Sequence, residues 1–194
     1  MINQYLFDLD DTLINTKIYA KLYKPILQLI ESKTKLKGNK LTEKAKRLGL
    51  EQNQYGRWDT GELCKGLGLL EEYYFELERL IEAVPVLSEG VKKVFRKIQS
   101  RGGRIGIVSN SMHRTIETYM LKYDLIQYVD FIFSQEDAGC KKSNSDYWRT
   151  LIKREKLNPP ECLVIGDNRT EDVEIPRKLG FNAYHLKSFA ELTI

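Results

Sequence analysis

Acidic residues follow two apolar runs of the chain, at positions where a charged site could form. Asp8, Asp10 and Asp11 come directly after an apolar run near the N-terminus. Asp167 ends a second apolar run, and Asp172 follows five residues later. Carboxylates at the ends of buried strands cost free energy unless they are paired, hydrogen-bonded or bound to a cation. If the two segments meet in the fold, these acids therefore need a positively charged partner.

A divalent cation would balance this charge, because few basic residues lie at the strand ends. Oxygen ligands without histidine or cysteine are those that Mg²⁺ prefers, together with water and a phosphate oxygen. Without the ion, repulsion between the carboxylates would raise the pKa of one or more of them. We therefore predict a magnesium site at Asp8, Asp10, Asp167 and Asp172.

Two further segments carry groups that can bind phosphate. Ser109 and Asn110 follow another apolar run, and they offer a hydroxyl and main-chain N–H groups that suit phosphate oxygens at a helix start. Lys141 and Lys142 follow a fourth run and add ammonium groups. A lysine at this place would offset the charge of both a carboxylate nucleophile and a phosphate.

The arrangement of apolar runs predicts how these segments are brought together. Short runs rich in β-branched and aromatic residues alternate with longer helical patterns, which is typical of βαβ units and a parallel sheet. In such a sheet, ligands bind beyond the carboxyl ends of the strands. The runs are Gln4–Phe7, Arg104–Val108, Phe131–Phe133, Cys162–Ile165 and Ala183–Leu186.

The helical patterns divide the chain into two parts. Helices between or before the strands are expected over Gly90–Ser100, Thr115–Leu125 and Asp146–Glu155. The stretch between the first two strands is several times longer than one crossover helix needs. Its own helical patterns cover Ile18–Ile30, Leu41–Leu48 and Leu69–Ala83. We therefore expect an α/β unit from residues 1–14 and 85–194, with a helical insertion at 15–84.

Composition excludes several classes of protein. The chain has 194 residues, 42% of them hydrophobic and 30% charged, and no apolar stretch is long enough to span a membrane. The net charge of +4 comes from basic residues dispersed among acids, so we expect no nucleic-acid partner. Three widely spaced cysteines indicate reduced thiols. We expect a cytoplasmic protein that is a monomer or a homodimer.

The four polar segments, in this order, resemble the motifs of the haloacid dehalogenase superfamily. The resemblance covers the whole α/β part, and the insertion stands where this family has its type 1 helical cap. It implies a doubly wound, Rossmann-like parallel sheet with the strand order 5-4-1-2-3. The family's pattern Asp-x-Asp-x-Thr falls on Asp8, Asp10 and Thr12, its serine or threonine on Ser109, its lysine on Lys142, and its last acidic pair on Asp167 and Asp172.

The resemblance also implies a mechanism for phosphoryl transfer. Asp8 would attack phosphorus, while Asp10 would protonate the leaving oxygen and then activate water. Mg²⁺ would be held by Asp8, the main-chain carbonyl of Asp10 and Asp167, with Asp172 as a further ligand or an acid beside the ligands. Ser109, the N–H of Asn110 and Lys142 would bind the transferred group.

Asp10 selects the branch of the family. Dehalogenases resemble this pattern but lack the second acid, whereas phosphatases and phosphomutases have it. We therefore predict a magnesium-dependent phosphatase that acts on a small phosphorylated metabolite. The alternatives are a phosphomutase, which protects the aspartyl phosphate from water, and a phosphate-binding module with little turnover.

Several assignments have a competing interpretation. Ser109 can instead cap a helix, and Asp172 can instead interact with the dipole of a helix at its N-terminus. The family's usual Lys-Pro-Asp-Pro is replaced here by Lys142-Ser143-Asn144-Ser145, which leaves open whether Lys141 or Lys142 points inward. Arg57 and Trp58 in the insertion could recognise the leaving group, or Trp58 could pack in the helical core with Arg57 at the surface.

Overall fold

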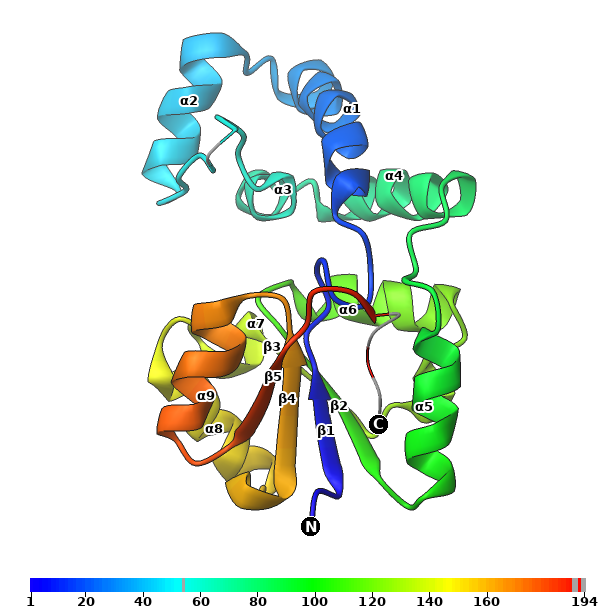
Figure 1. Cartoon of the computed structure of the whole chain (residues 1–194). Helices are drawn as coiled ribbons and strands as arrows, with labels where there is room; N and C mark the ends of the chain where they lie inside the picture. The colour runs from blue at the N-terminus through cyan, green and yellow to red at the C-terminus, as the bar shows by residue number, and fades with distance from the viewer. Residues whose placement is uncertain (54, 190–191, 193–194) are drawn as a thin grey trace. The chain divides into compact units, whose positions relative to one another are not determined.

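The computed structural model describes residues 1–53, 55–189 and 192 (Figure 1). The chain divides into two compact units, an α/β unit of Met1–Asn15 with Leu87–Ile194 and a helical unit of Thr16–Val86. Among the described residues, no helix has the length and hydropathy that a bilayer span needs.

The α/β unit is built on one parallel sheet, so the predicted fold class is confirmed. Its strands lie in the order β3-β2-β1-β4-β5, which is the predicted 5-4-1-2-3 arrangement. Each apolar run forms a strand whose bounds differ from the prediction by at most one residue at either end. The strands are β1 (Gln4–Phe7), β2 (Arg104–Ser109), β3 (Phe131–Ser134), β4 (Cys162–Gly166) and β5 (Asn182–His185).

Helices cover both faces of this sheet, with α8 and α9 on one side and α5 on the other (Figure 1). Alternation along β1 explains the two cores, since Leu6 belongs to the cluster that includes Trp148 of α8, whereas the Phe7 ring lies 5.0 Å from that of Phe95 in α5. The helices are α5 (Val91–Ser100), α6 (His113–Lys122), α7 (Gln135–Ala138), α8 (Ser145–Glu155) and α9 (Ile175–Lys178), with 3₁₀ turns η1 (Ile126–Tyr128) and η2 (Pro159–Glu161) and a π-helical segment η3 (Arg169–Glu174).

The strand register brings the polar segments to one edge of the sheet. Phe7 pairs with Ile107 of β2 and with Ile165 of β4, so the residues after these strands emerge at the same level. The amide of Asp8 continues the ladder by donating to the carbonyl of Ile165 at 2.9 Å. The carboxyl edge of the sheet is therefore where the candidate site must be sought.

In its described residues, the helical unit has four helices, one more than the sequence patterns predicted. The unexpected helix, α3, begins after Asp59, whose carboxylate accepts hydrogen bonds from the amides of Gly61 and Glu62, and it ends at Gly68 in the left-handed conformation. Two glycines inside α3 lower its helix propensity and weaken its signal in the sequence. The helices are α1 (Lys17–Thr34), α2 (Gly38–Arg47), α3 (Thr60–Leu67) and α4 (Leu70–Ala83).

Candidate active site

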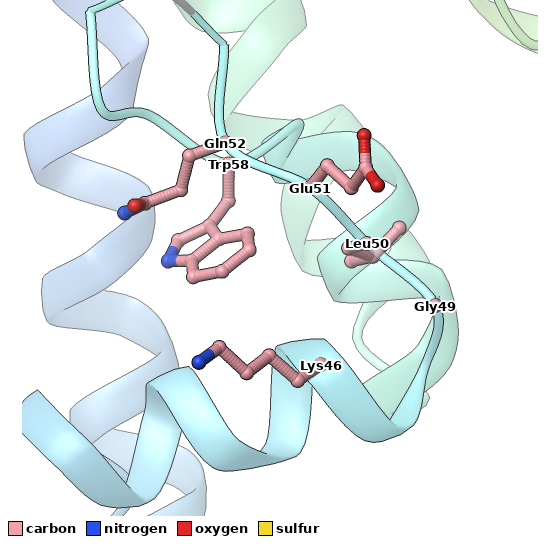
Figure 2. A pocket seen from close by; sticks show the side chains of 6 residues that line it. All are labelled: Lys46, Gly49, Leu50, Glu51, Gln52 and Trp58. Carbon is pink, nitrogen blue, oxygen red and sulfur yellow. The ribbon is translucent and has the colours of Figure 1, made fainter.

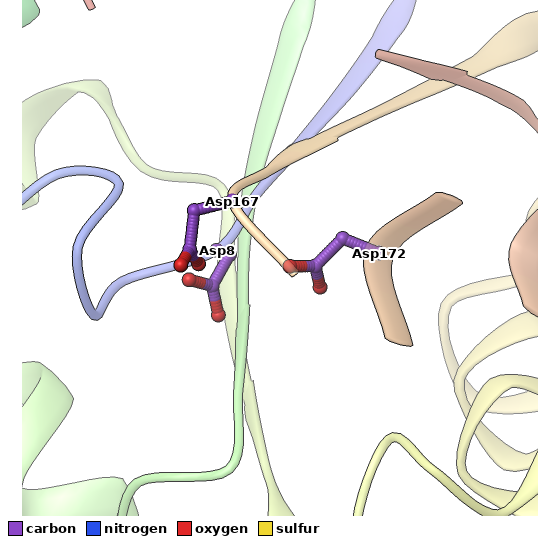
Figure 3. A group of neighbouring side chains, drawn as sticks. All are labelled: Asp8, Asp167 and Asp172. Carbon is purple, nitrogen blue, oxygen red and sulfur yellow. The ribbon is translucent and has the colours of Figure 1, made fainter. Parts of the chain in front are cut away.

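Three carboxylates meet at the carboxyl edge of the sheet (Figure 3). Asp8 follows β1, Asp167 follows β4, and Asp172 lies on η3. One carboxylate oxygen from each residue lies within 4.8 Å of the others. Asp8 and Asp172 are buried, at 4% and 0% exposure. Residues far apart in the sequence therefore form one dense negative site.

Lys142 lies inside this cluster of acids, whereas Lys141 is exposed. The ammonium of Lys142 forms ion pairs with Asp8 Oδ1 and with Asp172 Oδ1, the latter at 2.7 Å. It also lies 3.4 Å from the carbonyl oxygen of Val108 at the end of β2. Only 2% of Lys142 is exposed, so its ammonium contacts the carboxylates rather than solvent.

The charges in the cluster do not balance. Burial raises the pKa of Asp8 to about 8, since the neighbouring Lys142 ammonium only partly opposes burial, and Asp172 and Asp10 add to the rise. Burial, followed by the charge of Asp172, also raises the pKa of Asp167. Burial acts to lower the pKa of Lys142, but Asp8 and Asp172 outweigh it and hold the ammonium charged. A single lysine therefore leaves excess negative charge.

This excess and the donor set fit a magnesium ion. Asp8, Asp167 and Asp172 offer only oxygen donors, at a spacing at which one ion could contact them. The carboxylate of Asp10 is not part of this group. The family resemblance implies the main-chain carbonyl of Asp10 as a ligand, and this assignment stays a prediction. A bound Mg²⁺ would supply the missing positive charge and would favour the ionised form of Asp8.

The raised pKa of Asp8 predicts how stability depends on pH. Without metal, the unfolded chain releases this proton near its ordinary pKa of 3.8, while the folded protein holds it until about pH 8. The contribution of protonated Asp8 to the free energy of unfolding is therefore complete below about pH 4, and it is lost as the pH rises toward 8. We expect the Tm in EDTA to fall by about 10 °C between about pH 5 and pH 8, and to fall less with Mg²⁺. Asp8→Asn should flatten the EDTA curve, and an unchanged slope in that variant would contradict this assignment.

Asp10 lies beside the serine-rich segment after β2. Its Oδ2 accepts a hydrogen bond from the Ser111 hydroxyl at 2.7 Å. The amide of Ser111 in turn donates to Ser109 Oγ at 3.0 Å. Helix α6 begins at His113 with Met112 in the cap position, so Ser109 does not cap it. The Ser109 side chain instead orders the loop that reaches Asp10.

Asn110 connects this loop to the two other loops of the site. Its side-chain oxygen accepts from the Lys142 amide at 2.8 Å, and its side-chain nitrogen donates to Glu171 Oε2 at 2.7 Å. Glu171 and the Ser111 that contacts Asp10 were not among the site residues expected from the sequence. Each lies within two residues of a motif position, and this proximity was the only signal that could have indicated them.

Gly166 makes room for the buried acid of η3. A Cβ placed on Gly166 would lie 2.3 Å from Asp172 Oδ2, which is far inside van der Waals contact. The amide of Asn168 donates to the same oxygen at 3.0 Å. A residue without a side chain at the end of β4 therefore allows Asp172 to reach Lys142.

Arg57 and Trp58 lie in the helical unit. Trp58 is 8% exposed and lines a hollow of about 430 Å³ with Lys46, Gly49, Leu50, Glu51 and Gln52 (Figure 2). The Arg57 guanidinium lies over the ring of Tyr23, 5.5 Å from its centre. Recognition of a leaving group by these two residues stays a prediction.

Comparisons with known proteins show the family of the chain. Residues 5–185 match the family model described as haloacid dehalogenase-like hydrolase. The chain is 24% identical over 210 residues to glyceraldehyde 3-phosphate phosphatase of Methanothermobacter thermautotrophicus, covering 100% of this chain and 88% of that protein. Haloacid dehalogenase-like hydrolase domain-containing protein 3 of Homo sapiens is 25% identical over 96 residues, which cover 50% of this chain and only 38% of the human protein.

A solved structure shares the fold over the whole chain. The HAD-hydrolase YfnB from Bacillus subtilis, bound to magnesium, superposes with a TM-score of 0.62 at 19% identity. The match covers 100% of this chain and 90% of that structure. At this identity, the likeness shows the fold alone.

Proposed function

Because the chain belongs to the haloacid dehalogenase-like hydrolases, we propose that it is a magnesium-dependent phosphatase with Asp8 as its nucleophile. The observation that carries the proposal is the contact of Lys142 with both Asp8 and Asp172, beside Asp167. An ammonium and several acids at a strand edge can bind a phosphoryl group, neutralise its charge and present a carboxylate to phosphorus.

Each residue has a distinct proposed part in the reaction. Asp8 attacks phosphorus and becomes an aspartyl phosphate, while Asp10 gives its proton to the leaving oxygen. Asp10 then accepts a proton from the water that attacks the intermediate, which releases phosphate and restores Asp8. Lys142, the Ser109 hydroxyl and the main-chain N–H of Asn110 hold the phosphoryl oxygens. Bound Mg²⁺ would neutralise charge on the phosphoryl group and on the acids.

The proposed substrate is a small phosphorylated metabolite. A relative aligned over the whole chain is named for its action on glyceraldehyde 3-phosphate, which is a molecule of this class. We propose that the helical unit of Thr16–Val86 acts as the cap that selects among such molecules. Arg57 and Trp58 are its candidate recognition residues.

Release of inorganic phosphate from p-nitrophenyl phosphate tests this function. We expect steady release with Mg²⁺ and a loss of at least about 100-fold in EDTA, because the excess carboxylates then repel the phosphate. Adding excess Mg²⁺ after the EDTA treatment should restore the rate of phosphate release. Isomerisation of a sugar phosphate that requires a bisphosphate primer would indicate the phosphomutase instead, and tight phosphate binding without release would indicate the binding module.

Ser111 supports the proton transfer that we assign to Asp10. Replacing Ser111 with alanine removes the hydroxyl that donates to Asp10 Oδ2, so the acid is less well oriented and its ionised form less stabilised. We expect kcat to fall about 10-fold with little change in KM, and the acidic limb of the pH–rate profile to move to higher pH. Ser111→Thr retains the hydroxyl and serves as the control. An unchanged pH–rate profile for Ser111→Ala would argue against this contact.

A further inference from the structure

Both polar groups of the Asn110 side-chain amide form hydrogen bonds. Its oxygen accepts from the main-chain N–H of Lys142, and its nitrogen donates to a carboxylate oxygen of Glu171. Only one orientation of the amide satisfies both neighbours, because a flipped amide would face the carboxylate with its oxygen and the N–H with its own donors. Glu171 therefore determines which end of Asn110 faces Lys142.

The loop that carries Lys142, from Gly139 to Ser145, has no proline to restrict its main chain. The main chain of Lys142 is instead held from both sides, since its carbonyl accepts from Trp148 Nε1 at 3.1 Å. The Trp148 side chain is buried in the core, whereas the Asn110 contact depends on a partly exposed loop. The N–H side is therefore the less secure of the two anchors.

We propose that Glu171 is a positioning residue for Lys142, acting through the Asn110 side chain. The two hydrogen bonds of the Asn110 side chain, one from the Lys142 N–H and one to Glu171, form what we call the tie. The tie connects the loop after β2, the loop that carries Lys142 and the segment after β4, and each of these contributes residues to the candidate site. By fixing the main chain of Lys142, the tie positions its ammonium against the carboxylates of Asp8 and Asp172. The effect on turnover rests on the proposed function, whereas the tie itself does not.

Glu174 is a suitable control for Glu171, because it is a nearby acid with a different partner. Glu174 lies on the same segment, η3, but pairs with Arg169 at 3.1 Å and is 46% exposed. Glu171 meets an amide that continues to Lys142, whereas Glu174 meets a surface guanidinium. If η3 required acids only for its own stability, the two residues would behave alike.

Hydrogen exchange at the Lys142 amide tests the tie without using activity. We expect exchange to become about 10-fold faster in Glu171→Ala, in line with the loss of one hydrogen bond. Glu171→Gln keeps a side-chain oxygen that can accept from Asn110, so it should exchange like the parent, as should Glu174→Ala. Exchange that is unchanged in Glu171→Ala, or equally fast in Glu174→Ala, would overturn the proposal.

Phosphate release then separates this inference from the proposed function. We expect kcat to fall about 10-fold in Glu171→Ala, with recovery in Glu171→Gln and no loss in Glu174→Ala. If the parent releases no phosphate but exchange at Lys142 still responds to Glu171→Ala, the proposed function is wrong and the tie stands. If kcat falls equally in the alanine and glutamine variants, Glu171 does not act through a hydrogen bond to Asn110, and the inference is wrong.

Discussion

Replacing Asp8 with asparagine is expected to lower kcat for phosphate release by more than about 10⁴-fold. Asparagine has nearly the same shape, but its amide cannot attack phosphorus. The fold should tolerate the change, because it removes a buried carboxylate whose pKa is raised to about 8. We therefore expect the rate to be lost while the protein stays folded.

Steady-state phosphate release with Mg²⁺ measures this effect, with thermal unfolding recorded for the same preparations. Asp11→Asn is the matched control, because Asp11 is the exposed neighbour in the same loop and asparagine also tolerates its left-handed conformation. We expect Asp11→Asn to retain most of the parent's rate. A rate for Asp8→Asn within 10-fold of the parent's would rule out Asp8 as the nucleophile.

Replacing Lys142 with methionine should reduce both activity and stability. Methionine keeps much of the side-chain volume but removes the ammonium that contacts Asp8 and Asp172. Breaking a buried charge pair costs about 3–5 kcal/mol, because the remaining carboxylates lose their counterion. Loss of a cation that faces the phosphoryl group should lower kcat by about 10²–10³-fold.

Kinetics and thermal unfolding of Lys142→Met, with and without Mg²⁺, check both effects. Lys141→Met is the control, because this neighbouring lysine is exposed. We expect Mg²⁺ to recover part of the lost stability, since the ion supplies positive charge to the same acids. Equal losses in the Lys141 and Lys142 variants would contradict the assignment of the buried lysine.

The sequence predicted the sheet well because its signals are local. Each strand is a short apolar run rich in β-branched or aromatic residues, and parallel pairing follows from the helices between them. Once the strands are parallel, residues that follow them must gather at one edge. Asp8, Asp167 and Lys142 could therefore be proposed as neighbours although most of the chain separates them.

Side-chain contacts between loops could not be predicted in the same way. The Asn110 amide was considered only through its main-chain N–H, and Glu171 and Ser111 were not considered. Their roles depend on how three loops pack, and neither residue type nor spacing specifies that packing. Helix α3 was missed for another reason, since the cap at Asp59 stabilises a segment whose glycines disfavour a helix.

The covalent intermediate on Asp8 is the central claim, and reductive trapping tests it most directly. Borohydride added during turnover of p-nitrophenyl phosphate with Mg²⁺ should reduce an acyl phosphate at Asp8 to homoserine within the tryptic peptide Met1–Lys17. Asp10→Asn should increase the trapped fraction, because p-nitrophenolate leaves without an acid while hydrolysis of the intermediate lacks its base. We expect mass spectrometry to locate homoserine at Asp8 in the parent and in Asp10→Asn. Phosphate release without any reduced Asp8 in either protein would contradict the account.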